Sequence, residues 1–305
     1  MPRRWIHLAA LFAITLPLLG GCAADTKNAM RVAASTDSAK GIHQEQSVRG
    51  VSPLVDKHWV QDPRNYYETQ NVVINKAVSV PILEYHEAKY VPGDIATLKP
   101  GQFLSEIEWL HRHNFHTINF GQLYAAMYHG YKLPPRPIIL TFDDGYESVY
   151  FNVYPLLKKY HDQAALFVIA GYTHEKPNRK KEFPNLTIPE LREMQASGLV
   201  DVEDHTMTHP DLRTLSESKA QYEIHGSAQV LEKIVNHPML FFCYPDGGYT
   251  QETISLVRKA GYLLAVTQNG GYANWRQGPW TLHRISVLDF TTLQDFAKKL
   301  SPSLS

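Results

Sequence analysis

Cysteine is scarce in this chain, which has 2 among its 305 residues, and neither sign of charge is in excess. Thirty lysines and arginines balance thirty aspartates and glutamates, so no bulk field favours nucleic acid or an anionic membrane surface as a partner. No block of like charge forms a tail, and no repeat with a period of about 20 to 50 residues is visible. What remains is a globular chain, 44% hydrophobic and 20% charged, with room for one large domain or two modest ones.

An apolar run of limited length occupies residues 5–21, directly after Arg3 and Arg4. It is too short and too interrupted by proline to span a bilayer convincingly, whereas basic residues before such a run are typical of an export signal. The run ends in LLGGC at Cys22, which resembles the lipobox of bacterial lipoproteins, in which the cysteine is lipidated. Ordinary secretory cleavage nearby is the alternative. We therefore expect a lipoprotein signal peptide over residues 1–22 and an exported protein, lipid-anchored to the outer face of the cell membrane.

The second cysteine, Cys243, decides whether the mature chain can form an intrachain disulfide. If Cys22 is acylated, Cys243 is a lone thiol and the mature chain contains no intrachain disulfide. Residues 23–75 are small and polar with little apolar periodicity, which predicts a flexible tether. We expect the folded domain to occupy residues 76–305.

Strand and helix patterns alternate from Val78 onward. Apolar, β-branched runs predict strands at residues 78–86, 115–120, 137–142, 164–172, 199–205, 240–245, 262–268 and 280–287, with helical periodicity between most of them. Such alternation predicts parallel strands joined by helical crossovers. Roughly seven or eight units favour an α/β fold of the (β/α) barrel type, distorted or incomplete, over an open sheet.

In such barrels the functional groups follow the carboxyl ends of the strands. Four predicted strands end in polar residues of this kind, in LEYH (83–86), TFDD (141–144), VEDH (202–205) and CYPDGG (243–248). Asp143 and Asp144 stand side by side where a buried strand should end, so their mutual repulsion needs compensation. A metal ion is one explanation, and a helix start with the turn-forming Gly145 is the other.

Two histidines provide further candidate ligands. His205 and His209 are four residues apart and would face the same side of a helical turn. Alone this pair carries little weight, because such pairs often lie on a solvated face. Two imidazoles with one carboxylate suit zinc and would also accept iron, cobalt or nickel, and such a trio leaves coordination positions open for water and substrate.

The combined motifs resemble the polysaccharide deacetylases (NodB-homology domains, carbohydrate esterase family 4). TFDDG (141–145), HTMTHP (205–210) and FFCYPDGGY (241–249) are similar to the first three motifs of that family. PILEYH (81–86), the segment 100–115 and HRISV (283–287) resemble the branch that deacetylates poly-β-1,6-N-acetylglucosamine. The resemblance implies a NodB-like barrel and a metal-dependent hydrolase that removes N-acetyl groups from a surface N-acetylglucosamine polymer. Peptidoglycan, chitin oligomers and acetylxylan are alternative substrates, and a non-catalytic, lipid-anchored carbohydrate-binding protein is an alternative of another class.

The resemblance also implies roles for individual residues. Asp143 becomes the general base, while Asp144, His205 and His209 become the metal ligands, with Zn²⁺ as the expected cation and Co²⁺, Ni²⁺ or Fe²⁺ as alternatives. The backbone around Tyr244, Pro245 and Gly247 is implied to bind substrate and to assist the oxyanion.

The general acid and one arginine are less directly implied. Family members protonate the leaving amine with a strand-end histidine, for which we choose His86, with His283 as the alternative. The family's third motif commonly carries an arginine that pairs with the catalytic aspartate, but this sequence has Cys243 in that region, and Arg284 is a candidate replacement. Tyr85, Tyr146 and Trp280 could stack on sugar rings, although aromatic residues in a barrel more often belong to the core.

Overall fold

The computed structural model describes residues 72–177 and 181–301. The expected signal peptide, the lipidation site Cys22 and most of the expected tether lie outside these residues. At the start of the described part, the N–H groups of Val73 and Asn75 donate to the carbonyls of Tyr128 and Met127. Among the described residues, none of the helices has the length and apolar character needed to cross a membrane.

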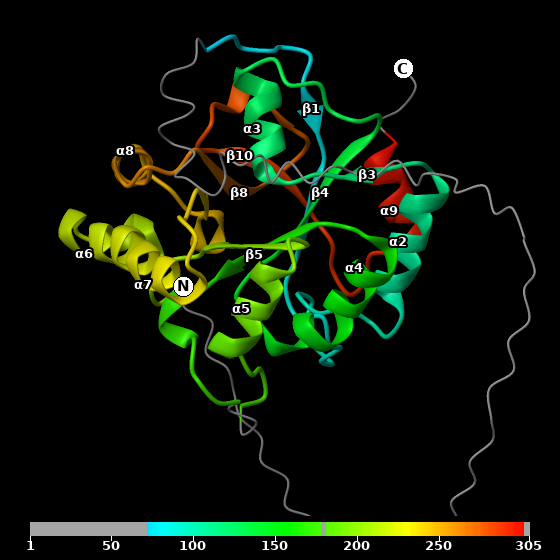
Figure 1. Cartoon of the computed structure of the whole chain (residues 1–305), viewed down its shortest axis with the longest axis horizontal. Coiled ribbons are helices and arrows are strands. Elements are labelled where there is room, and N and C mark those ends of the chain that lie inside the picture. The colour runs from blue at the N-terminus through cyan, green and yellow to red at the C-terminus, as the bar shows by residue number, and fades with distance from the viewer. Residues whose placement is uncertain (1–71, 178–180, 302–305) are drawn as a thin grey trace, which may run out of the picture. The chain divides into compact units, whose positions relative to one another are not determined.

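Seven parallel strands close into a barrel (Figure 1). In order around the barrel they are β2 (Ile82–Tyr85), β4 (Pro137–Phe142), β5 (Ala164–Val168), β6 (Val200–Asp204), β7 (Phe241–Cys243), β8 (Leu264–Gly270) and β10 (Leu282–Ser286). Strand β2 pairs with both β4 and β10, which closes the ring. The expected α/β fold is therefore confirmed as a closed barrel, distorted in having seven strands in place of eight.

Three short strands lie outside the ring. Strand β3 (His116–Thr117) pairs with the beginning of β4, and β1 (Ser79–Val80) forms a separate antiparallel pair with β9 (Ala273–Asn274). The expected strand over residues 115–120 is thus much shorter, because Asn119 caps the next helix through a capping box with Gln122.

Helices join the strands, and all of them except α3 cover the outside of the barrel (Figure 1). They are α2 (Gln102–Arg112), α3 (Phe120–Tyr128), α4 (Tyr154–Tyr160), α5 (Ile188–Ala196), α6 (Glu217–Gln221), α7 (Ser227–Val235), α8 (Gln251–Lys259) and α9 (Leu293–Leu300). One turn of π-helix, Tyr222–Gly226, joins α6 to α7, and another, Val149–Val153, precedes α4. Short 3₁₀ turns occur at Ala170–Tyr172, Leu212–Thr214, Pro245–Gly247 and Trp275–Gln277.

Strand alternation separates two apolar clusters. Residues such as Leu83 and Leu140 pack outward against the helices, whereas Ile82, Ile139 and Phe167 belong to a cluster on the inner side. Helix α3 contributes Phe120, Leu123 and Met127 to the inner cluster. The amino-terminal half of the barrel is thereby filled with apolar side chains, so the polar residues that follow further along each strand gather at the carboxyl end.

Candidate active site

The two adjacent aspartates follow β4. Asp143 continues the inward alternation of the strand and is 1% exposed. Asp144 and Gly145 both have left-handed backbone conformations, with φ of 71° each, so the chain turns sharply after the strand. This turn keeps the Asp144 carboxylate at the same end of the barrel as Asp143, although successive side chains of a strand point to opposite faces.

Asp144, His205 and His209 converge as the sequence predicts. The Nε2 atoms of His205 and His209 lie 3.4 and 3.6 Å from Oδ1 of Asp144. This oxygen is buried and has no hydrogen-bond partner among the described residues. His205 Nδ1 lies 2.8 Å from the carbonyl oxygen of Cys243. An N–H at Nδ1 leaves the Nε2 lone pair facing the carboxylate, which is repulsive unless a cation lies between them. The three residues therefore fit a divalent cation.

The local geometry of the histidine pair differs from the prediction. His205 and His209 do not lie on a helical turn but on a loop after β6, with Thr206 and His209 in left-handed conformations of φ 70° and 60°. The Thr206 N–H donates to Asp204 Oδ1 at 2.7 Å, and the His209 N–H donates to Thr206 Oγ1 at 3.0 Å. These side-chain bonds compete with helical ones and hold the turn instead.

Electrostatics favour the ligand-competent forms of Asp144 and His209. Burial would raise the pKa of Asp144, but its interaction with the nearby His205 ring outweighs burial, so this pKa lies below its ordinary value. Burial and the nearby His205 charge lower the pKa of His209. Metal ligands must be unprotonated, so both shifts favour cation binding. Burial would lower the pKa of His205, but Cys243, Asp144 and Asp143 outweigh it and raise this pKa, so a cation that binds here displaces a proton from the ring.

Asp143 has a different partner. Arg284, which is fully buried, donates from Nη1 and Nη2 to the two carboxylate oxygens of Asp143 at 2.8 and 2.7 Å. Burial alone would raise the pKa of Asp143, but the charge and hydrogen bonds of Arg284 outweigh it and hold this pKa below its usual range. Arg284 thus stands where the arginine of the third motif was expected.

Cys243 completes this buried group. Its Sγ lies 3.2 Å from Arg284 Nη2 and 3.4 Å from Asp143 Oδ2. Burial raises the pKa of the thiol to about 11, so Cys243 is neutral at physiological pH. The cysteine therefore fills space beside the ion pair without adding charge.

His86 lies in the site and His283 does not. His86 Nε2 is 3.9 Å from Asp143 Oδ2 and from Glu84 Oε1, and the side chain is 17% exposed. His283 precedes the inward-pointing Arg284 on β10 and lies against Gly271. Alternation along the strand accounts for this separation.

Glu84 is a site residue that the sequence analysis missed. Its carboxylate accepts a hydrogen bond from Ser286 Oγ at 2.9 Å and lies 3.6 Å from Arg284 Nη2. It is 2% exposed and therefore links Arg284 to His86 inside the barrel. Its position two residues before His86 on an expected strand was the available signal, since such residues share a face.

The loop after β7 places a free N–H near the trio. The Tyr244 and Gly247 N–H groups donate to the carbonyls of Val266 and Tyr244, and Pro245 has no N–H. Among the described residues, none accepts a hydrogen bond from the N–H of Asp246, which has φ of 52°. The Asp246 charge also acts on His209. The loop was expected to supply such a donor, but Asp246 itself was missed.

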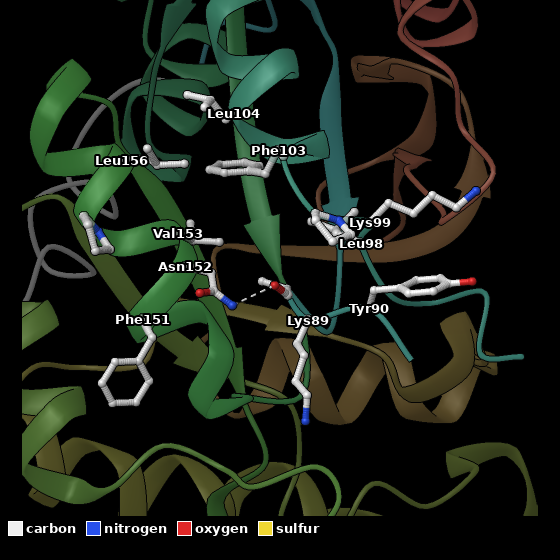
Figure 2. A pocket seen from close by; sticks show the side chains of 14 residues that line it. Lys89, Tyr90, Leu98, Lys99, Phe103, Leu104, Phe151, Asn152, Val153 and Leu156 are labelled. Atoms are coloured by element: carbon white, nitrogen blue, oxygen red, sulfur yellow. Dashed lines mark hydrogen bonds between the residues drawn. The ribbon is translucent and has the colours of Figure 1, made fainter. Parts of the chain in front are cut away.

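A groove of about 510 Å³ lies between the loop after β2 and the turn before α4 (Figure 2). The Asn152 side chain donates to the carbonyl of Ala88, two residues after His86, at 3.0 Å. Phe151 is 54% exposed and Tyr90 is 37% exposed, so their rings are available to a ligand. Tyr85, by contrast, is fully buried and donates to Glu106, so it belongs to the core, as aromatic residues in a barrel more often do.

Known proteins similar to this chain match the part of it that contains the site. Residues 130–265 match the family model for polysaccharide deacetylase. The chain is 28% identical over 278 residues to the Bacillus subtilis (strain 168) protein YxkH, which is named for the same family, covering 90% of this chain and 92% of that protein.

A relative with a named substrate and a solved structure are also similar. The poly-β-1,6-N-acetyl-D-glucosamine N-deacetylase of Staphylococcus aureus (strain MRSA252) is 30% identical over 176 residues, which cover 54% of this chain and 59% of that protein. The Streptococcus pyogenes deacetylase PplD, solved with acetate, superposes with a TM-score of 0.67 at 28% identity, covering 74% of this chain and 99% of that one.

Proposed function

This chain belongs to the polysaccharide deacetylases, hydrolases that act on carbon–nitrogen bonds, and from that premise we propose that it removes N-acetyl groups from a poly-β-1,6-N-acetylglucosamine-like polymer with the help of a divalent metal. The observation that carries the proposal is the convergence of the Asp144, His205 and His209 trio beside the Asp143–Arg284 pair. An ionised carboxylate held next to a cation site has the composition needed to hydrolyse an amide.

The trio supplies the electrophilic part of the site. When bound by Asp144, His205 and His209, a divalent cation such as Zn²⁺ would lower the pKa of a water molecule and polarise the acetamide carbonyl. Buried Asp144 Oδ1 and the oriented His205 ring preorganise the ligands for that cation.

Asp143 acts as the general base. Both of its oxygens are engaged by Arg284, which holds the carboxylate away from the role of ligand and keeps it ionised. A carboxylate oxygen can accept more than one hydrogen bond, so Asp143 can still accept the proton of the attacking water.

His86 acts as the general acid, and the free N–H of Asp246 assists. As the tetrahedral intermediate collapses, the carbon–nitrogen bond breaks and His86 gives a proton to the departing amine, so the products are acetate and the free amino sugar. The Asp246 N–H would donate to the oxyanion. Glu84, near both His86 and Arg284, orients the acid relative to the base.

Two further features support the choice of a polymer. The Staphylococcus aureus relative carries the name of a poly-β-1,6-N-acetyl-D-glucosamine N-deacetylase. The groove that begins two residues after His86 offers the exposed rings of Phe151 and Tyr90 to neighbouring sugar units. We also propose export and lipid anchoring through Cys22, which rest on the sequence alone.

The substrate is tested by incubating the full chain with β-1,6- and β-1,4-linked N-acetylglucosamine oligomers and with acetylxylan. Free amine and acetate are measured separately. We expect amine release from the β-1,6 oligomers above all, and its loss in Asp143→Asn. Acetate from acetylxylan without amine from any oligomer would identify an esterase instead. Binding of oligomers without release of either product would support the carbohydrate-binding alternative.

A further inference from the structure

A second group of potential metal ligands lies outside the active site. Asp201 and Glu203 belong to β6, and His237 lies in the connection between α7 and β7. One ligand atom from each residue lies within 4.8 Å of the other two. None of these residues belongs to the Asp144, His205 and His209 trio, which follows the other end of β6.

Glu203 is the centre of this group. It is fully buried, and its Oε2 accepts hydrogen bonds from the N–H groups of Leu240 and Phe241 at 2.9 Å each. Its Oε1 is buried and has no hydrogen-bond partner in the described part of the chain. A buried carboxylate oxygen without a partner costs free energy, so another group must satisfy it.

His237 also carries an unpartnered buried atom. Its Nδ1 is buried without a hydrogen-bond partner among the described residues. These two unpartnered atoms and the Asp201 carboxylate thus lie close together. Asp201 interacts with the side chain of Gln195, but none of the described residues hydrogen-bonds to Glu203 Oε1 or His237 Nδ1, and a cation between them satisfies both.

The site lies at the weakest seam of the barrel. Strands β6 and β7 share the single pair Asp204↔Phe242, whereas β5 and β6 share five pairs. Glu203 replaces backbone hydrogen bonds that are missing between β6 and β7, because its carboxylate accepts hydrogen bonds from the N–H groups at the start of β7. Asp201 and His237 are half-buried, so an ion can enter from solvent.

We propose that Asp201, Glu203 and His237 bind a second divalent transition-metal ion, which joins β6 to the segment before β7. One imidazole with two carboxylates is a mixed N/O set that suits Zn²⁺ and accepts Mn²⁺. We assign this ion a structural role, because its ligands do not include Asp143 or His86. Its binding does not depend on deacetylase activity.

The test counts bound metal in a protein that lacks the active-site ligands. The full chain carrying Asp144→Asn and His209→Ala is stripped with chelator, dialysed against Zn²⁺ and assayed for bound metal and melting temperature. We expect one equivalent to remain bound and the melting temperature to rise with Zn²⁺. Adding Glu203→Gln, which keeps an acceptor for the Leu240 and Phe241 N–H groups, should abolish both.

A second variant tests the same site in case the first variant does not fold. His237→Ala alters a half-buried side chain in a connection and should reduce bound Zn²⁺ from two equivalents to one in the otherwise unchanged chain. One equivalent in the unchanged chain would overturn the proposal and leave a proton as the occupant of this group. Two equivalents in the His237→Ala variant would overturn it by placing the second ion elsewhere. Neither result would affect the proposed deacetylase, whose test is product release.

Discussion

At the scale of single residues, Asp143 and Asp144 are neighbours in the chain but have separate partners. Asp143 lies against Arg284, whereas Asp144 faces two imidazoles with an unpaired oxygen. The repulsion of two adjacent carboxylates is therefore compensated twice, once by a guanidinium and once by a cation site. Each compensation assigns its aspartate a different chemical role.

Asp143→Asn is expected to lower kcat by about 10²- to 10⁴-fold, because an amide cannot accept the proton of water. Metal content should stay the same, since both carboxylate oxygens of Asp143 are held by Arg284 and Asp143 is not among the expected ligands. Parallel measurement of bound metal and amine release checks both statements. Loss of metal together with activity would show that Asp143 holds the trio together and would contradict its role as base.

Arg284→Gln should move the acidic limb of the kcat/KM profile to higher pH. Arg284 holds the pKa of Asp143 below its usual range, so its removal raises that pKa, and the base becomes protonated at pH values where it is normally ionised. A pH–rate profile of the variant against the unchanged chain measures the shift. An unmoved acidic limb would show that Asp143 does not control it.

The same variant should lower the free energy of unfolding by about 3 to 5 kcal/mol, because it leaves a buried carboxylate unpaired. The double variant Asp143→Asn with Arg284→Gln removes both charges and should recover part of that loss. Denaturant unfolding of the three variants completes the cycle. A double variant less stable than the single one would contradict the pairing.

At the scale of elements, the sequence predicts those features that a local pattern of residues determines. Strand β4 occupies the expected residues 137–142 because its apolar run ends in charge. The contact between Arg284 and Asp143 joins residues 141 positions apart, which no local pattern encodes. Similarly, Thr206 and Asp204 hold the loop of His205 by side-chain bonds that a spacing argument does not detect.

The loop after β7 depends on Gly247. Its φ is 65°, and a Cβ there would lie 2.6 Å from the backbone nitrogen of Gln268. Gly247→Ala should cost about 1 to 3 kcal/mol of overpacking in addition to the left-handed strain, and should lower kcat/KM because the Asp246 N–H shifts.

Gly198→Ala is the matched control, since Gly198 has φ of 70° but no atom within 4 Å of an added Cβ. It should show the backbone strain alone and retain activity. Thermal melts and steady-state rates compare the two variants. Equal effects of both substitutions would show that the close approach to Gln268 is unimportant.

Helix α2 carries a pH-dependent contribution to stability. Burial raises the pKa of Glu106 to about 7, despite hydrogen bonds from Gln102 and Tyr85. The folded state therefore holds this proton more tightly than the unfolded state. Its stabilising contribution is complete below about pH 4.5 and falls by roughly 3 kcal/mol as the pH rises to about 7.

Glu106→Gln should remove this dependence, so the difference in free energy of unfolding between the two proteins changes across that pH range. Urea unfolding at several pH values measures it. Glu108→Gln, on the same helix, controls for the loss of one carboxylate. Parallel pH dependences for the unchanged chain and Glu106→Gln would contradict the assignment.

At the scale of the whole molecule, one half of the barrel interior is apolar and the other half is polar. The inner cluster with α3 fills one half, and Glu84, Asp143, Arg284 and the histidines occupy the other. Alternating strand and helix patterns predict this class of fold, and they predict that the functional residues follow the carboxyl ends of the strands. They cannot predict closure with seven strands, because closure depends on the pairing of β2 with both β4 and β10.

The most direct test relates activity to metal occupancy. The full chain is stripped with chelator and given Zn²⁺ in small steps, while bound metal and the rate of amine release from β-1,6-linked N-acetylglucosamine oligomers are measured together. The site predicts no turnover without metal and a rate that rises from zero as metal binds to Asp144, His205 and His209. Undiminished amine release from protein that contains no metal would contradict it.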